Sequence, residues 1–321
     1  MKGNGRFWSW ILALPLAGFL LWWSLRGVDW KAVWATIAGA RWKFLAVAGL
    51  FTCLSFFMRS LRWRILLNAE ENLPLGTVFC ATMAGYLGNA FLPARAGEVV
   101  RTLVVSGRSK LTRTYVLTTA LSERLMDVIA LILWASIILL GVHPKPDWMA
   151  GAARAMAIAA GMGAVAIAVL PHTGGLCQNI LRRLPLPHAL RGRFIELVDQ
   201  VLLGMRAFHH PGRFLGFAAL TVLIWVSDGV GTMIAARALS LGMSFSMAML
   251  LLTGLGLASA LPSTPGYVGI YQFVAVTVLV PLGIAKSGAL AFILVVQAYG
   301  YVVTLLLGLP CLYILRSKKA V

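Results

Sequence analysis

The sequence predicts an all-α protein that crosses a membrane several times. Hydrophobic residues make up 60% of its 321 residues, charged residues only 12%, and the mean hydropathy of +0.86 is far from that of a soluble domain. Eight or more apolar segments alternate with short basic clusters. We expect about six full spans, two re-entrant or broken helix pairs and an inverted repeat, within a single integral membrane domain covering residues 1–321.

Six apolar runs are expected to cross the membrane completely. They are 7–25, 44–58, 112–142, 148–170, 214–239 and 287–315. The first resembles a signal peptide, but its length and its lack of a small-residue cleavage site favour an uncleaved span. After it, Trp30, Val33, Trp34 and Ile37 recur at helical spacing, which predicts a short helix lying flat at the membrane interface. A loop with scattered tryptophans is the alternative.

Basic residues outnumber acidic ones by 28 to 10, which gives a formal net charge of +18. They occur in short clusters between apolar runs, as the positive-inside rule describes, so we expect no nucleic-acid partner. We place both termini and the clusters in the cytoplasm, where the clusters would contact anionic lipid. The clusters are 59–64, 108–113, 182–193 and 316–319. Residues 171–212 are expected to form a basic, amphipathic cytoplasmic connection.

Residues 85–101, which read GYLGNAFLPARAGEVVR, interrupt the apolar sequence. They contain charged and helix-breaking residues, which are unfavourable in lipid. Irregular backbone and charge are tolerated at membrane depth only where protein or water surrounds them. We therefore expect an apolar helix over 75–92 and a returning half-helix over 99–106, both reached from the cytoplasmic side. The residues expected to break the approach helix are Gly88, Asn89 and Pro93.

A second break resembles the first. The first reads LGNAFLPARAGE from Leu87 and the second LGLASALPSTPGY from Leu255, each with Leu-Gly, then Leu-Pro, then a glycine four residues after the proline. We expect helices over 245–261 and 268–282 around the second break, which contains Pro262, Pro265 and Gly266. Paired interrupted helices are typical of an inverted-repeat transporter with its site near the midplane. Chance similarity between apolar sequences is the alternative.

Several charged residues lie inside or beside the predicted spans, where each costs about 2.5 to 3.5 kcal/mol at a helix centre. We expect them to share a polar cavity, and its charge count, near zero, favours a zwitterionic or weakly charged head group. Ion pairs are predicted for Glu98 with Arg101 and Arg124 with Asp127, at i and i+3, and for Arg95 with Glu123. Trp225 and Asp228 are expected to line the same path. For any single ion pair, the alternative is a purely structural role in holding two helices together.

The chain resembles the lysylphosphatidylglycerol synthase transmembrane region, or flippase-like domain family. The residues that carry the resemblance are Asn89, Leu92-Pro93, Arg95, Gly97-Glu98, Arg101, Ser122-Glu123-Arg124, Asp127, Pro262, Pro265-Gly266 and Gly269. Such domains form the membrane half of multiple peptide resistance factors, which translocate aminoacylated phospholipid, and others are linked to polyprenyl-phosphate glycolipids or hopanoids. The resemblance implies a bacterial plasma membrane protein. The sequence contains no soluble aminoacyltransferase domain, so the resemblance does not imply lipid synthesis. Gln272 stands where family members often have a glutamate, so no role for a carboxylate is inferred at that position.

The sequence therefore predicts a lipid flippase that is not an enzyme. No phosphate-binding GxxxxGK[ST] loop and no HExxH motif occur, and the four cysteines have no metal-type spacing, so no cofactor and no metal are expected. A transferase using Glu123 and Asp127 as acid and base, a channel, or a non-catalytic partner of a lipid synthase are the alternatives; a homo-oligomer is left open. The residues predicted to bind or pass the lipid are Asn89, Pro93, Arg95, Gly97, Glu98, Arg101, Glu123, Arg124, Asp127, Trp225, Asp228, Pro262, Pro265, Gly266 and Gln272.

Overall fold

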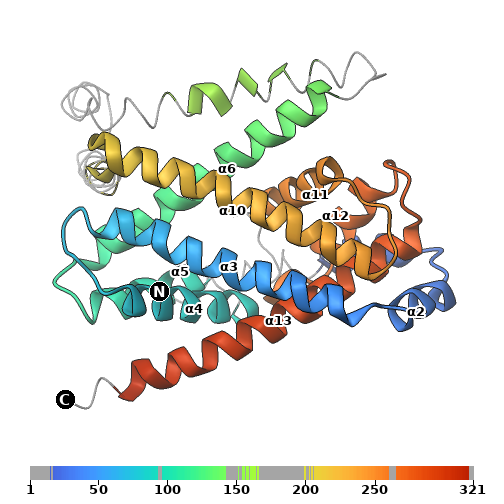
Figure 1. The fold of residues 1–321 in the computed structure, drawn as a ribbon, viewed down its shortest axis with the longest axis horizontal. Helices are drawn as coiled ribbons and strands as arrows, with labels where there is room; N and C mark the ends of the chain where they lie inside the picture. Colours follow the sequence, from blue (N-terminus) through green and yellow to red (C-terminus); the bar gives the residue numbers. More distant parts are fainter. Residues whose placement is uncertain are drawn as a thin grey trace. The chain divides into compact units, whose positions relative to one another are not determined.

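The computed structural model describes residues 15, 17–92, 96–141, 206–259 and 265–317, with scattered residues between 151 and 204. Within these residues every regular element is a helix (Figure 1). The chain divides into two compact units, each built from segments that are distant in sequence. Unit 1 comprises Met1–Phe57, Met83–Gly97 and Ile224–Val321, and unit 2 comprises Met58–Thr82 and Glu98–Leu223.

Four helices of 26 to 32 residues are long and apolar enough to cross a membrane. They are α3 (Trp42–Leu67), α6 (Arg113–Gly141), α10 (Pro211–Ala238) and α13 (Lys286–Ser317). Each is about 40 Å long or more, which exceeds a ~30 Å hydrocarbon core, so each must tilt or protrude. Four of the predicted spans are thus observed as helices, while 148–170 is described only at scattered residues and 7–14 lie outside the described residues. Residues 17–25 are helical.

The short helix predicted after the first span is present as α2 (Trp30–Ala38). It begins at Asp29, whose Oδ1 accepts hydrogen bonds from the backbone N–H groups of Lys31, at 2.9 Å, and Ala32, at 3.1 Å. This is the usual arrangement of an N-cap aspartate. Val33 is fully buried and packs with Val276 and Leu290, which fixes α2 within unit 1.

The first helix pair consists of α4 (Leu75–Phe91) and α5 (Gly97–Ser106). The prediction that Gly88 and Asn89 interrupt the approach helix was wrong, because α4 continues through both and ends at Phe91. A glycine inside a helix costs only about 1 kcal/mol, and helical hydrogen bonds remain the best use of the backbone in an apolar setting. Pro93 lies outside the described residues.

The start of α5 folds back onto α4. The backbone N–H of Gly97 donates to Oδ1 of Asn89 at 3.0 Å. A Cβ atom at position 97 would collide with the carbonyl oxygen of Gly85 and with the Asn89 side chain, so this close approach requires glycine. The predicted helical hairpin is therefore present, and its re-entry into the membrane remains a prediction.

The second pair consists of α11 (Phe245–Ala258) and α12 (Ile270–Leu279), joined through the short 3-10 turn η3 (Pro265–Tyr267). The two helices pack against each other, and Gly254 of α11 lies against Val274 of α12. In the turn, Gly266 and Gly269 have positive φ angles of 69° and 90°. At both positions a Cβ would also meet another group, which explains why the chain turns at glycines here.

Each unit has its own hydrophobic core. In unit 1, buried residues of α10, α11, α12 and α13 pack around Phe292. In unit 2, Trp63 packs with Tyr115, Phe217 and the turn η2 (Arg206–His209), where Phe208 is buried. The end of the predicted connection 171–212 thus packs into a core, and most of its remaining residues lie outside the described part.

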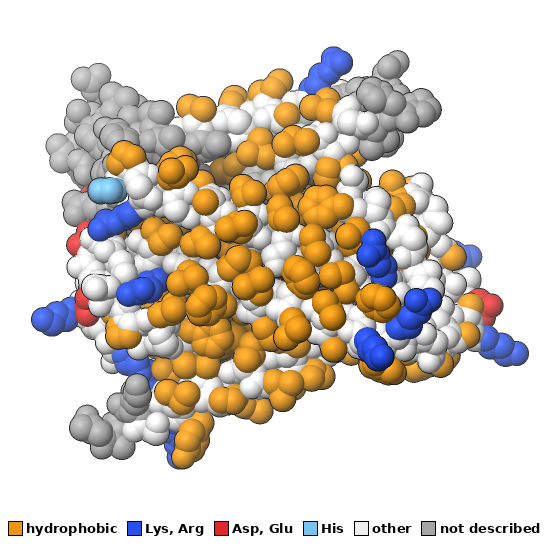
Figure 2. All heavy atoms as spheres, in the orientation of Figure 1, with side chains coloured by type: hydrophobic (Ala, Val, Ile, Leu, Met, Phe, Trp, Pro, Cys, Tyr) orange, Lys and Arg blue, Asp and Glu red, His pale blue; other side chains and the backbone are white. Residues whose placement is uncertain are grey.

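The outer faces of the long helices are apolar. Leu50 of α3, Leu215 of α10 and Leu306 of α13 are each about two-thirds exposed, and Figure 2 shows hydrophobic side chains over much of the visible surface. Helices that are apolar on both their packed and their outer faces are typical of membrane spans. With the four long apolar helices, this surface identifies a multi-pass membrane protein.

Candidate functional site

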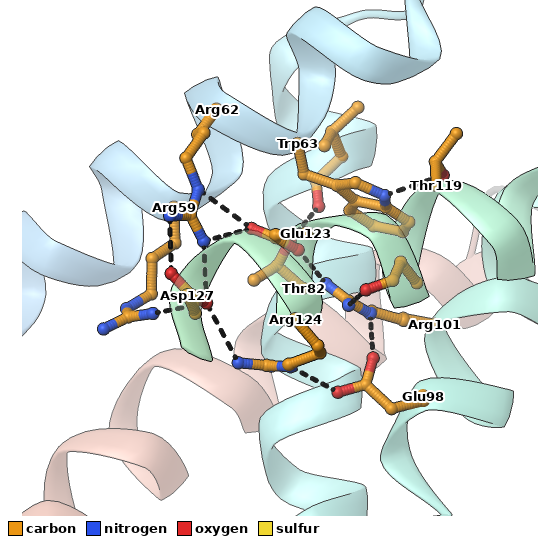
Figure 3. A network of polar contacts seen from close by, with 12 residues as sticks. Arg59, Arg62, Trp63, Thr82, Glu98, Arg101, Thr119, Glu123, Arg124 and Asp127 are labelled. Atoms are coloured by element: carbon orange, nitrogen blue, oxygen red, sulfur yellow. Dashed lines mark hydrogen bonds and ion pairs between the residues drawn. The ribbon is translucent and has the colours of Figure 1, made fainter. Parts of the chain in front are cut away.

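Seven charged side chains of unit 2 form a network of ion pairs (Figure 3). They come from three helices. The members, hereafter the ionic network, are Arg59 and Arg62 of α3, Glu98 and Arg101 of α5, and Glu123, Arg124 and Asp127 of α6.

Arg62 occupies the most buried position of the ionic network, with a side chain that is 0% exposed. Its Nη1 lies 2.7 Å from Oδ1 of Asp127 and its Nη2 lies 2.9 Å from Oε1 of Glu123. Nη1 also donates to Oγ1 of Thr221 at 3.1 Å, and the guanidinium group lies over the ring of Phe217. One planar cation therefore neutralises two carboxylates that stand one turn apart on α6.

Arg101 joins the other side of Glu123 to α5. Its Nη1 donates to Oε2 of Glu123 at 2.8 Å, and its Nε lies 2.5 Å from Oε2 of Glu98. Its guanidinium carbon lies 4.5 Å from the centre of the Trp63 ring, a cation–π arrangement. The indole N–H of Trp63 donates to Thr119 at 3.1 Å, which holds the ring in place. Arg101 is thus fixed on two sides.

The most exposed end of the ionic network is formed by Arg124 and Glu98. Nε of Arg124 donates to Oε1 of Glu98 at 2.9 Å, and its Nη1 lies 3.6 Å from Oδ2 of Asp127. The Arg124 side chain is 28% exposed and that of Glu98 14%, against 0% for Arg62. Arg59 approaches Asp127 at 3.6 Å. The network therefore runs from a closed interior at Arg62 to a partly open end at Arg124.

Two of the predicted ion pairs are confirmed, Glu98 with Arg101 and Arg124 with Asp127. The predicted partner of Glu123, Arg95, lies outside the described residues, and Glu123 is held instead by Arg62 and Arg101.

Arg62 and Arg59 were missed as site residues. The cluster that contains them was placed beyond the end of a span and in contact with anionic lipid, but α3 continues to Leu67 and both side chains are buried. A signal was available, since no glycine or proline separates Met58 from Leu67 and the two arginines stand three residues apart on one helical face.

The charge of the site also differs from the prediction. The ionic network contains four arginines and three carboxylates, because Arg59 and Arg62 belong to it and were not in the predicted count. Trp225 and Asp228 belong to unit 1, where Trp225 is buried and Asp228 is half-buried within electrostatic range of Tyr299. These two predicted residues therefore belong to unit 1, whereas the ionic network belongs to unit 2.

A second, neutral polar cluster surrounds the turn between α11 and α12 in unit 1. Oε1 of Gln272 accepts from the backbone N–H of Gly269 at 2.7 Å, and its Nε2 donates to Oε1 of Gln297 at 2.5 Å. Gln297, at 3.1 Å, and the hydroxyl of Tyr301, at 2.6 Å, both donate to the carbonyl oxygen of Gly266. These bonds satisfy backbone groups that the turn removes from helical pairing.

The neutral cluster brings together two of the predicted residues, Gly266 and Gln272. Pro265 lies at the start of the same turn, and Pro262 lies outside the described residues. Gln297 and Tyr301 were not predicted, since they stand in the middle of α13, where an isolated amide or phenol gives no motif.

The described residues contain no group of three or more His, Cys, Asp or Glu side chains that could hold a metal ion. The carboxylates of the ionic network instead all face guanidinium groups. What this arrangement offers a ligand is a set of arginine donors with fork geometry, which suits phosphate and carboxylate groups.

Comparison with known proteins gives a family and one distant relative. No solved structure matches the chain. A protein named glycosyltransferase AglD, from Haloferax volcanii, is 25% identical over 317 residues, covering 88% of this chain and 50% of that protein. The chain thus spans about half the length of this curated relative. The profile of the family described as "Lysylphosphatidylglycerol synthase TM region" matches residues 10–308. The chain therefore belongs to the lysylphosphatidylglycerol synthase transmembrane-region family.

Proposed function

We propose that this protein moves a polar-headed lipid between the two leaflets of a membrane, with the head group passing the ionic network. The observation that carries the proposal is the network itself, in which seven charged side chains meet on helices α3, α5 and α6. Two of these helices have membrane-crossing length. Ionisable residues within spans usually mark a substrate or ion path.

Stability alone is a weak reason for such a network. Replacing a buried ion pair by apolar side chains of similar volume is often neutral or even stabilising, by about 1 to 4 kcal/mol. A protein that needed only to hold α3 against α6 could do so with leucine and alanine. Seven charged residues gathered on packed helices of a membrane protein therefore favour a role in handling a charged group.

The open end supports a mode of entry for the head group. Arg124 and Arg101 both bind Glu98, and a phosphate can replace a carboxylate on a guanidinium group because both accept paired N–H bonds. Aminoacyl phospholipids and polyprenyl-phosphate-linked sugars carry such a phosphate, whereas a hopanoid without phosphate would satisfy the arginines less well.

This function fits a setting in the bacterial plasma membrane, with both termini in the cytoplasm. The sequence contains no nucleotide-binding phosphate loop, so movement of lipid would be downhill or coupled to an ion gradient.

A second candidate function is suggested by the relative. The chain covers half of a protein named as a glycosyltransferase, so this family domain can be joined to further sequence. The protein would then be a non-catalytic membrane partner of a lipid synthase, or itself a membrane-embedded lipid-modifying transferase, alone or as a homo-oligomer. Glu123 and Asp127 would be the acid and base of the transferase.

Lipid movement is tested by reconstituting the purified protein in liposomes that contain head-group-labelled fluorescent lipids in both leaflets. Dithionite added outside bleaches the outer leaflet, and further bleaching reports lipid that has moved outward. We expect faster loss of inner-leaflet fluorescence than in protein-free liposomes for phosphate-bearing lipids. Three arms would use an aminoacyl phospholipid, a polyprenyl-phosphate sugar and a hopanoid.

Bleaching that stops at the outer leaflet for every lipid, with folded protein present, would refute the transport function. Mass spectrometry of the recovered lipids separates the alternatives. A chemically modified lipid would indicate a transferase, and unmodified, unmoved lipid would favour the role of a partner protein.

A further inference from the structure

We propose that one end of unit 1 is a docking surface for anionic lipid head groups. This surface, hereafter the basic end, consists of residues 22–43, which include α2, and the segments 237–244 and 280–286. The backbone N–H of Arg41 donates to the carbonyl oxygen of Ala238 at 2.8 Å, which joins the first two segments. Nζ of Lys286 donates to the carbonyl oxygen of Arg26 at 2.6 Å, which joins the third.

The basic end carries six cations and one carboxylate. The cations are Arg26, Lys31, Arg41, Lys43, Arg237 and Lys286. The carboxylate, Asp29, caps the N-terminus of α2. None of the six cations forms an ion pair with a carboxylate among the described residues. The contrast with the ionic network is clear, since there every arginine has a carboxylate partner.

Exposed tryptophans accompany these cations. Five of them, between 43% and 71% exposed, lie within residues 22–42: Trp22, Trp23, Trp30, Trp34 and Trp42. Arg26 lies over the ring of Trp22 and Lys286 over that of Trp23, at 5.5 and 5.9 Å from the ring centres. Figure 2 shows basic and hydrophobic side chains side by side around this end of the unit.

The combination of unpaired cations with exposed indole rings selects a membrane surface as the partner. Indole rings partition to the level of the lipid head groups, and Lys and Arg side chains beside them attract phosphate. Anionic head groups would supply the counter-charge that the protein lacks here. Neutral lipid would satisfy the tryptophans but would supply no counter-charge to the six cations.

This surface is distinct from the clusters predicted from sequence to meet anionic lipid. Two members of those clusters, Arg59 and Arg62, are buried in the ionic network and are unavailable. The proposal is also independent of lipid movement, because it concerns the lipid around the protein and not a lipid that passes through it.

The test uses brominated lipids, which quench tryptophan fluorescence on contact. The protein is placed in phosphatidylcholine nanodiscs containing an equal fraction of either brominated phosphatidylglycerol or brominated phosphatidylcholine. The signal of Trp34 is the difference between the wild type and Trp34→Phe. We expect brominated phosphatidylglycerol to quench this signal at least about twofold more, because each nearby cation enriches anionic lipid.

The triple variant Lys31→Gln, Arg41→Gln, Lys43→Gln should lose this preference, so that the two lipids quench equally. The matched control, Lys110→Gln, Arg113→Gln, Arg316→Gln, removes the same charge from exposed positions that are not part of the basic end and should keep it. Equal quenching in the wild type, or an equal decrease in the control, would overturn the proposal. Because this experiment measures no transport, a negative result would overturn the docking surface without bearing on the proposed lipid movement, which the liposome assay tests separately.

Discussion

At the scale of single residues, Arg62 is the side chain on which the ionic network depends most. Glu123 and Asp127 stand at i and i+4 on α6, a spacing at which two like charges repel. Arg62 donates to both from α3 and also reaches Thr221 on α10. Its removal would leave two buried carboxylates with less compensation than any other single change in the network.

Arg62→Gln is expected to lower the free energy of unfolding by about 3 to 5 kcal/mol, the usual cost of removing one partner from a buried ion pair. Arg64→Gln is the control, on the same helix. Arg64 is half-buried and donates to the Leu73 carbonyl, so its loss should cost only about 1 kcal/mol. Unfolding in detergent, followed by intrinsic fluorescence, measures both. Equal destabilisation by the two variants would contradict the central position of Arg62.

At the scale of elements, the two helix pairs share one type of hydrogen bond. In each, a side-chain amide oxygen accepts the N–H of the glycine at which the return helix begins, Asn89 for Gly97 and Gln272 for Gly269. Each glycine follows a proline by four residues, Pro93 and Pro265. The counterpart of Gly97 is therefore Gly269, whereas the sequence comparison aligned it with Gly266.

Gly97→Ala should disrupt the first pair. The added methyl group would meet the Gly85 carbonyl oxygen, which is backbone and cannot move aside cheaply. We expect a loss of about 2 kcal/mol or more, within the range for overpacking a tight contact. Gly76→Ala serves as control, because a Cβ there meets nothing within 4 Å. If both variants unfold at the same temperature, the contact between α4 and α5 is wrong.

Gln297 and Tyr301 should behave as a coupled pair. Both donate to the Gly266 carbonyl oxygen, so either alone can satisfy it, and only the loss of both leaves it without a donor. In a double-mutant cycle with Gln297→Leu and Tyr301→Phe, we expect the double variant to lose about 0.5 to 3 kcal/mol more than the sum of the single variants. Thermal unfolding of the four proteins measures this coupling, and strict additivity would count against a shared acceptor.

At the scale of the whole molecule, the sequence predicts the helices better than it predicts which side chains bond to each other between helices. Three helices agree within a few residues with their expected ranges: α4 with 75–92, α6 with 112–142 and α11 with 245–261. The agreement arises because long apolar runs ended by Pro, Gly or a charged residue leave few alternatives for where a helix begins and ends. Ion pairs at i and i+3 were also predictable, since one helix determines them.

Contacts between helices could not be predicted in this way. The bonds of Arg62 to Glu123 and Asp127, and of Gln272 to Gln297, depend on how separate helices pack, for which sequence spacing gives no rule. Arg62 was not predicted as a site residue for a further reason. The sequence around an arginine near a predicted span end is the same whether the side chain contacts water or a buried carboxylate.

Topology is a property of the whole chain and can be tested with single cysteines. In a background without the native cysteines Cys53, Cys80, Cys177 and Cys311, we place one cysteine at Ala35, Arg108 or His143. If α3 and α6 each cross and the α4–α5 hairpin returns to its side of entry, as the sequence predicts, Arg108 should be labelled from the cytoplasm and the other two from outside. Labelling of Ala35 and Arg108 from the same side would mean that the hairpin crosses fully.

The most direct test of lipid passage through the ionic network is the transport rate of Arg124→Gln in liposomes, normalised to folded protein. Arg124 lies at the open end and is 28% exposed, so this variant should fold. We expect a loss of at least about tenfold, the equivalent of one charge-assisted hydrogen bond to the head group. Arg113→Gln, an exposed cation at the start of the same helix, should transport at the wild-type rate. A wild-type rate in Arg124→Gln would show that the ionic network only holds the helices together.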